Sequence, residues 1–146
     1  MVIEEPVLMD TGPLVALLSE RDRDHQECVS VAKVLPLGKV YTCWPVLTEA
    51  AFLLKKRAGK QIPEELFNTV VSHRIELLTV GWMDLPGIQD VYTKYPDQDV
   101  DLADAMLVHL AERENINAVF TLDRRHFRVY RRPSGDVFRL LPDDFQ

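Results

Sequence analysis

The chain has 146 residues, with 17 Lys and Arg against 23 Asp and Glu, so its formal net charge is −6. This length is typical of one domain, and we expect a single domain over residues 1–146. The longest apolar run, residues 50–54, is far shorter than the ~20 residues that cross a bilayer. Residues 1–5 lack the features of a signal peptide. We therefore expect a cytoplasmic protein that makes no membrane contact.

The remaining composition narrows the function classes further. Cys28 and Cys43 form no CxxC pair and no cluster with His, which argues against a disulfide scaffold or a structural zinc site. The negative net charge argues against nonspecific duplex binding through bulk charge. A local basic patch is still compatible with this negative net charge.

The apolar pattern alternates between strands and helices along the chain. We expect strands over residues 6–9, 40–43, 75–80 and 118–121, and a short fifth strand over residues 137–141. We expect helices over residues 13–18, 24–35, 46–57, 63–73, 85–95 and 101–114. Pro13 and Pro45 suit the first turns of two of them, and Gly59 ends the third helix. This alternation predicts an α/β sandwich around a mostly parallel sheet.

Four acidic residues occupy unusual places in this pattern. Asp10 closes the first strand and Asp123 follows the fourth, whereas Glu49 and Asp104 lie in the first turns of helices. The carboxyl ends of parallel strands lie along one edge of a sheet, where ligand sites of open α/β sheets form. The sequence therefore predicts that these four carboxylates converge in one cleft.

Converging carboxylates repel one another and favour a cation. Two unit charges about 4 Å apart cost roughly 4 kcal/mol at an effective dielectric of about 20, of which a helix N-terminus offsets about 0.3–1 kcal/mol. Ligands that are all oxygen suit Mg²⁺ or Mn²⁺, and such ions usually act on phosphate groups. The chain has no Walker A loop and no GxSxG motif. The pattern therefore favours metal-assisted hydrolysis of a phosphodiester.

A group of arginines beside Asp123 agrees with a polyanionic substrate. Six arginines fall within 16 residues, with Asp136 as the only acid among them: Arg124, Arg125, Arg128, Arg131, Arg132 and Arg139. Guanidinium groups bind phosphate oxygens in a forked geometry. We expect the first five to bind the phosphates of a nucleic acid, and Phe127, Tyr130 and Phe138 to offer stacking faces for bases.

Four motifs in order resemble those of the PIN domain family, across essentially the whole chain. They are Met9-Asp10-Thr11-Gly12-Pro13, Thr48-Glu49, Asp101-Leu102-Ala103-Asp104-Ala105 and Thr121-Leu122-Asp123. Each motif is weak alone, but the four together on the correct elements are fairly specific. The length resembles the VapC type, the ribonuclease toxin of toxin–antitoxin pairs.

This resemblance implies a three-layer α/β/α sandwich and a ribonuclease dependent on Mg²⁺ or Mn²⁺. It also implies homodimers, an antitoxin that covers the site, and cleavage products with 5′-phosphate and 3′-hydroxyl ends. By position, Asp10, Glu49, Asp104 and Asp123 match the family's acidic residues. Glu49 would bind the metal directly or through water. Thr121 matches a supporting hydroxyl residue, and Asp101 is a less certain metal ligand.

Each of these residues also has a purely structural interpretation. Asp10 and Asp123 would then be turn residues, Glu49 would only complement a helix dipole, and Asp101 would be an N-cap. Thr121 would be an ordinary strand residue, His126 a packing residue, and the arginines a solvated surface. The corresponding alternative function is an RNA- or protein-binding module of the same fold, without nuclease turnover. A phosphotransfer receiver domain fits poorly, because the third strand offers no acceptor Asp.

Overall fold

The computed structural model describes residues 2–58 and 63–145. Its five strands are β1 (Val7–Met9), β2 (Val40–Thr42), β3 (Glu76–Leu77), β4 (Ala118–Phe120) and β5 (Arg139–Leu141). Its α-helices are α1 (Thr11–Leu18), α2 (His25–Ala32), α3 (Trp44–Ala58), α4 (Glu64–Val71), α5 (Leu85–Lys94), α6 (Leu102–Glu114) and α7 (Arg124–Val129). A short 3₁₀ helix, η1 (Trp82–Asp84), precedes α5.

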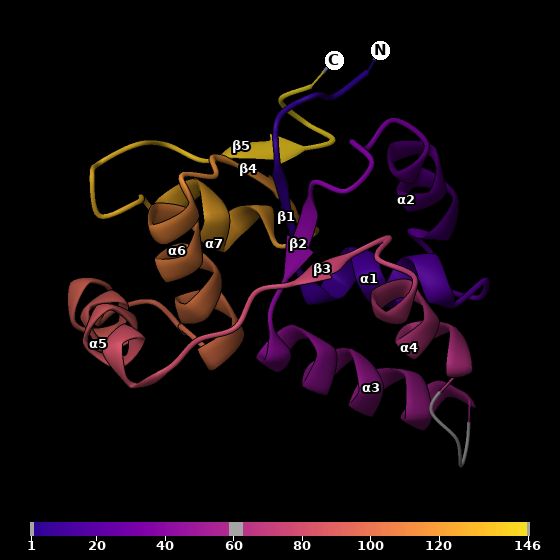
Figure 1. Cartoon of the computed structure of the whole chain (residues 1–146), viewed down its shortest axis with the longest axis horizontal. Helices are drawn as coiled ribbons and strands as arrows, with labels where there is room; N and C mark the ends of the chain where they lie inside the picture. The colour runs from indigo at the N-terminus through magenta and orange to yellow at the C-terminus, as the bar shows by residue number, and fades with distance from the viewer. Residues whose placement is uncertain (1, 59–62, 146) are drawn as a thin grey trace.

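The strands form one sheet in the order β3-β2-β1-β4-β5, and every neighbouring pair is parallel. The connections from β1 to β3 run toward one edge, whereas those from β3 to β5 run back past β1 toward the other. Because such crossovers are right-handed, the first set of helices must cover one face and the second set the other. Figure 1 shows α1 to α4 on one side of the sheet and α5 to α7 on the other. The predicted α/β/α sandwich is confirmed, with a fully parallel sheet.

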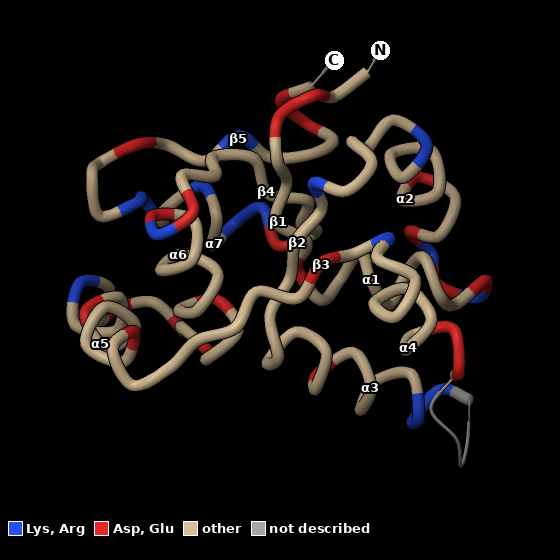
Figure 2. The backbone as a smooth tube through the Cα atoms, viewed as in Figure 1, with Lys and Arg blue, Asp and Glu red and all other residues tan. Residues whose placement is uncertain are grey.

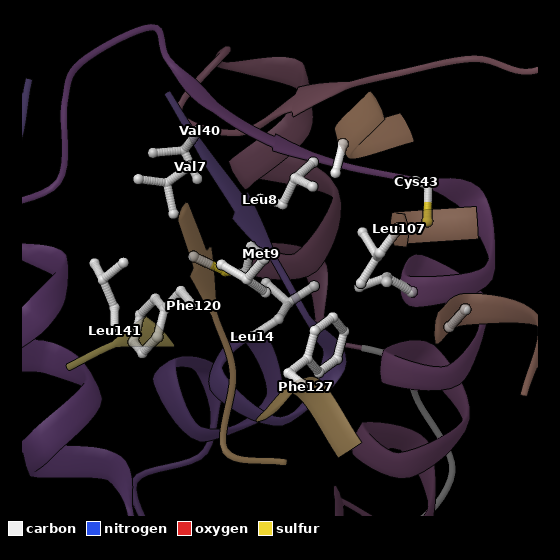
Figure 3. Packing of buried hydrophobic residues seen from close by; sticks show 14 of the residues in the cluster. Val7, Leu8, Met9, Leu14, Val40, Cys43, Leu107, Phe120, Phe127 and Leu141 are labelled. Carbon is white, nitrogen blue, oxygen red and sulfur yellow. The ribbon is translucent and has the colours of Figure 1, made fainter. Parts of the chain in front are cut away.

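Strand β1 lies at the centre of the hydrophobic core. Val7, Leu8 and Met9 are each at most 1% exposed, because helices cover both faces of a parallel sheet and leave no solvent-facing side. This explains why the strand is a continuous apolar run rather than an alternating one. Figure 3 shows these side chains packed among residues of the neighbouring strands and of the helices, including Phe120, Leu14 and Phe127.

Some elements differ from the sequence-based expectations in their bounds. The third strand covers only Glu76–Leu77 instead of residues 75–80, since it pairs with β2 alone at the edge of the sheet. Helix α7 was not predicted; Asp123 caps it by accepting a hydrogen bond from the His126 N–H at 3.2 Å. Helix α1 begins at Thr11 because the Asp10 side chain caps it. The predicted stop at Gly59 lies outside the described residues.

The strand order reverses between β1 and β4, and this position organises the rest of the molecule. Successive crossovers leave β1 and β4 in opposite directions, so their carboxyl ends open a crevice between the two layers of helices. The residues that follow these strands are Asp10 and Thr121. Both chain ends lie together at the opposite end of the strands (Figure 1). Over the described residues, no helix combines the length and the apolar character needed to cross a membrane.

Candidate metal and phosphodiester site

Asp10 and Asp123 meet across the crevice through the hydroxyl of Thr121. Thr121 Oγ1 donates to Asp10 Oδ2 at 2.8 Å and accepts from the Asp123 N–H at 2.9 Å. The other oxygen of Asp10 accepts from the Thr11 N–H at 2.8 Å. Both Asp10 and Thr121 are buried, at 7% and 0% exposed. The sequence-predicted hydroxyl of Thr121 is therefore a bridge between two of the predicted acids.

Asp104 and Asp101 approach from the first turn of α6. Asp101 is the N-cap of this helix, and its Oδ1 accepts from the Asp104 N–H at 2.8 Å. Asp104 itself is 6% exposed, and its Oδ2 accepts a hydrogen bond from the Tyr130 hydroxyl at 2.8 Å. The predicted capping role of Asp101 is confirmed, and it brings a further carboxylate beside Asp104.

Glu49 is joined to the site through Thr11. The Thr11 hydroxyl donates to Glu49 Oε2 at 3.1 Å, while the N–H of the same residue donates to Asp10. The expected position of Glu49 in a first helical turn is wrong, because α3 begins at Trp44 and has no acid in its first turn. Glu49 is exposed and lies too far along α3 to gain much from the helix dipole, whose effect is confined to the first turn.

Burial and mutual repulsion raise the pKa of the two buried carboxyl groups. The pKa of Asp10 rises to about 6, mainly through desolvation, with smaller contributions from Asp101 and Asp123. The pKa of Asp104 rises to about 7, again mainly through desolvation, followed by the charge of Asp101. These carboxylates therefore lie close enough to repel one another, and a cation beside them would lower the pKa of each.

The acids are neighbours without forming a closed set of ligands. Across residues 2–58 and 63–145, no group of three or more His, Cys, Asp or Glu side chains lies close enough together to hold a metal ion. Each carboxylate instead accepts a hydrogen bond from the protein, and like charges keep the groups apart. The predicted acids therefore lie at one edge of the sheet, as expected. Within the described residues they do not form a complete coordination shell for a metal ion.

Most of the six clustered arginines are paired with acids that are distant in sequence. Arg124 contacts Asp143 and Glu27, and Arg128 contacts Asp144, at 2.7 to 3.1 Å. Arg139 pairs with Glu5. In Figure 2 the blue segment of β5 lies beside red segments near both chain ends. These pairs fasten α7 and β5 to the rest of the chain.

Two further arginines form side-chain hydrogen bonds within the fold, and a third forms none within the described residues. The Arg132 side chain is 6% exposed and contacts Glu112, Asn115 and Asn117 at 2.7 to 3.0 Å, so its expected role in RNA binding is corrected to a structural one. Arg131 donates to three backbone carbonyls at the end of α7. Arg125 is exposed, and within the described part of the chain its side chain has no hydrogen bond or ion pair.

The expected stacking faces are inside the core. Phe127, Tyr130 and Phe138 are at most 1% exposed, so they cannot stack on bases, and this expectation is wrong. The Tyr130 hydroxyl reaches Asp104, a contact that no local motif could predict because the two residues are 26 positions apart. His126 Nδ1 binds the Asp123 carboxylate, at 2.8 Å from Oδ2.

Two hollows flank the acidic residues. One, of about 1030 Å³, is lined by Gly12 and Leu122 next to Asp10, and by residues of α1 and α3. The other, of about 670 Å³, lies between α3 and α6 and has Glu49 and Asp101 on its wall. The second is mainly apolar, with the exposed rings of Trp44 and Phe52 beside it. Glu49 and Asp101 therefore line an open hollow, whereas Asp10, Asp104 and Asp123 line neither of these two.

Comparisons with known proteins agree with this arrangement. A model of the PIN domain matches residues 7–132. Ribonuclease VapC26 of Mycobacterium tuberculosis is 29% identical over 139 residues, which cover 93% of this chain and 100% of that protein.

Two solved structures share the fold. Mycobacterium tuberculosis VapC20, described as a sarcin-ricin loop cleaving toxin, superposes with a TM-score of 0.74 at 19% identity, covering 81% of this chain and 90% of its own. FitAB bound to the IR36 DNA fragment superposes with a TM-score of 0.55 at 17% identity, covering 80% and 85%. Because the family model spans most of the residues and includes all four acidic segments, the chain belongs to the PIN domain family.

Proposed function

We propose that this protein is a metal-dependent endoribonuclease and the toxin component of a type II toxin–antitoxin pair. One observation carries the proposal: carboxylates from four separate segments lie at the edge of the sheet where the strand order reverses, and two of them are buried with raised pKa values. Groups held in this way are typical of functional sites rather than of stabilising ones. The likeness to a protein named as a ribonuclease supports the same reaction class.

The donor set fits a hard divalent cation. Asp10 and Asp104 offer buried carboxylate oxygens, Asp123 and Glu49 offer more exposed ones, and all of these are oxygen ligands of the kind that Mg²⁺ and Mn²⁺ prefer. We propose that Asp10, Asp104 and Asp123 hold the ion, with Glu49 acting directly or through water and Asp101 adding charge. When bound, such an ion supplies a water of lowered pKa and neutralises charge on a phosphoryl oxygen.

The other residues of the site hold the carboxylates in place. Thr121 donates to one oxygen of Asp10 and accepts from the Asp123 backbone N–H, and so links the carboxyl ends of β1 and β4. His126 holds both oxygens of Asp123, at 3.0 and 2.8 Å. Such supporting hydrogen bonds fix the orientation of metal-binding side chains.

An RNA strand would lie over the carboxyl edge of the sheet, beside the acids and α7. Arg125 at the start of α7 follows Asp123 by two residues and is free to bind a phosphate within the described structure. Arg124 and Arg128 are about 40% exposed and contribute positive potential while paired. Arg131 contributes at the end of α7. We propose these four arginines as the phosphate-binding group.

A protein partner is the second part of the proposal. Trp44, Phe52 and Leu102 are each at least half exposed around the hollow between α3 and α6. Contiguous exposed apolar surface of this kind marks protein interfaces. We propose a cognate antitoxin as a partner, and self-association into homodimers.

Calorimetric titration of Mn²⁺ into metal-free protein tests the proposal, with Asp10→Asn as the comparison. We expect wild type to bind Mn²⁺ and the variant to lose most of that binding, because it loses one of the buried carboxylates that would hold the ion. Cleavage of a mixed RNA pool should require Mn²⁺ and fall at least 100-fold in the variant, with circular dichroism showing a retained fold. Full metal-dependent cleavage by Asp10→Asn would contradict the assignment. Mn²⁺ binding and RNA binding without any cleavage would favour the binding module instead.

A further inference from the structure

A buried tyrosine that no sequence motif connects to the acids lies against one of them. Tyr130 follows α7 and is 0% exposed. Its hydroxyl donates to Asp104 Oδ2 at 2.8 Å. A buried phenol needs a hydrogen-bond partner, and here that partner is a carboxylate in the first turn of α6.

The ring of Tyr130 is held firmly on several sides. Tyr95 and Phe127 meet it edge to face, each with ring centroids 5.2 Å away. His126 stacks on it at 6.1 Å. The Tyr95 hydroxyl accepts a hydrogen bond from the Arg131 N–H at 2.7 Å, which fastens the backbone next to Tyr130. The position of the phenol oxygen is therefore set by the core and not by Asp104.

We propose that Tyr130 is a positioning residue, whose hydroxyl fixes the rotation of the Asp104 carboxylate; the proposal rests on the function proposed above. Because the phenol hydroxyl holds Oδ2, the carboxylate group of Asp104 is fixed in one rotation. Its other oxygen, Oδ1, then points in one direction. Within the described residues Oδ1 has no hydrogen-bond donor, so it is the oxygen available to a cation. His126 binds Asp123 and also stacks on Tyr130, so one aromatic cluster supports two of the acids.

The substitution Tyr130→Phe tests this because it removes one oxygen atom and keeps the ring. Tyr95→Phe is the matched control: it removes a hydroxyl from the same cluster, but one bonded to backbone instead of to a carboxylate. We expect Tyr130→Phe to weaken Mn²⁺ binding about 10-fold in calorimetry, as supporting hydrogen bonds of metal ligands usually do. Tyr95→Phe should bind Mn²⁺ as wild type does, with a similar change in Tm.

A second readout separates positioning from a general structural role. In RNA cleavage, Tyr130→Phe should need about 10-fold more Mn²⁺ for its half-maximal rate and recover most of the wild-type rate at saturating Mn²⁺. Asp104→Asn should not recover at any Mn²⁺ concentration. Wild-type Mn²⁺ affinity in a folded Tyr130→Phe protein would overturn the proposal. So would unfolding of Tyr130→Phe while Tyr95→Phe stays folded, because the hydroxyl would then serve stability.

Failure of the proposed function gives a different result. If wild type and Tyr95→Phe themselves bind no Mn²⁺, the metal site is absent and the role of Tyr130 falls with it. If wild type binds Mn²⁺ and Tyr130→Phe binds it with the same affinity, the metal site remains supported. Only the positioning role of Tyr130 is then refuted.

Discussion

Each carboxylate at the carboxyl edge of the sheet accepts a hydrogen bond that holds at least one of its oxygens. The donors are Thr11 and Thr121 for Asp10, Thr11 for Glu49, the Asp104 N–H for Asp101, Tyr130 for Asp104, and His126 for Asp123. For Asp10 and Asp104, hydrogen bonds from these donors favour the charged form, but the cost of burial is larger and raises the pKa of both groups. The two buried acids therefore strain the metal-free fold at neutral pH.

This strain predicts how the stability of the metal-free protein depends on pH. The pKa values of Asp10 and Asp104 rise from 3.8 to about 6 and about 7, so between pH 4 and 7 the folded state holds more protons than the unfolded state. By linkage, the free energy of unfolding must fall as pH rises through this range. Each pKa unit corresponds to about 1.4 kcal/mol. We expect Asp104→Asn to reduce this fall, and to melt above wild type at pH 8.

Thermal melting in the presence of a chelator, at pH 4.5, 6 and 8, measures this effect. Asp90→Asn is the control, because Asp90 is exposed and has no ion pair or side-chain hydrogen bond within the described residues, so this variant should follow the wild-type profile. A wild-type Tm that rises from pH 4.5 to 8 with the same slope as that of Asp104→Asn would show that these carboxyl groups are not strained.

At the scale of elements, a polar clamp joins η1 and α5 to α6. Asp84 accepts hydrogen bonds from His109 Nε2 at 2.8 Å and from the Gly81 N–H at 2.9 Å, and Arg113 contacts both of its oxygens at 3.3 Å. These contacts lower the pKa of Asp84 to about 2. The clamp fixes α5 against α6, the helix that presents Asp104.

The clamp requires a glycine where α5 passes His109. A Cβ at Gly87 would lie 2.4 Å from His109 Nδ1, whereas a Cβ at Gly81 would have nothing within 4 Å. We expect Gly87→Ala to displace the His109 ring and lower the free energy of unfolding by about 1–3 kcal/mol, as overpacking does. Chemical denaturation measures the change, and Gly81→Ala, where the backbone is extended, should stay within about 0.5 kcal/mol of wild type. Equal stability of the two variants would contradict the clamp.

At the scale of the whole molecule, the site joins the two layers of helices. Asp10 and Glu49 come from β1 and the layer of α1 to α4, whereas Asp104 and Asp123 come from the layer of α5 to α7 (Figure 1). These residues lie far apart in the unfolded chain and come together only through the sheet. A cation that binds them must therefore bind the folded state almost exclusively.

Mn²⁺ should consequently raise the melting temperature of the whole domain. At a free concentration 100 times its Kd, such a ligand stabilises the folded state by about 2.7 kcal/mol, which for a chain of this size raises Tm by about 5–10 °C. Differential scanning calorimetry of wild type with and without Mn²⁺ gives the shift, and Asp10→Asn should show less than half of it. An unchanged wild-type Tm at millimolar Mn²⁺ would exclude a site that couples the two layers.

Local pattern predicted most elements because apolar periodicity and proline or glycine boundaries act over a few residues. The strand before Asp10 and the helix capped by Asp101 came out nearly as expected. Helix α7 was missed because it is short and rich in Arg, and its one buried residue, Phe127, packs against Tyr130 and Phe138 instead of belonging to a regular apolar stripe. The third strand came out too long because its only neighbour in the sheet is β2.

The alternation of strands and helices, and hence the edge of the sheet at which Asp10, Asp104 and Asp123 gather, follow from local sequence pattern. Strand ends and helix starts are local features, and parallel topology brings them to one edge. The side chains that hold these acids follow from the three-dimensional packing alone. Folding paired most of the arginines with acids from distant segments, put the expected stacking rings into the core, and brought the Tyr130 hydroxyl to Asp104. Such pairings depend on burial and on contacts between residues far apart in the chain, which no local pattern records.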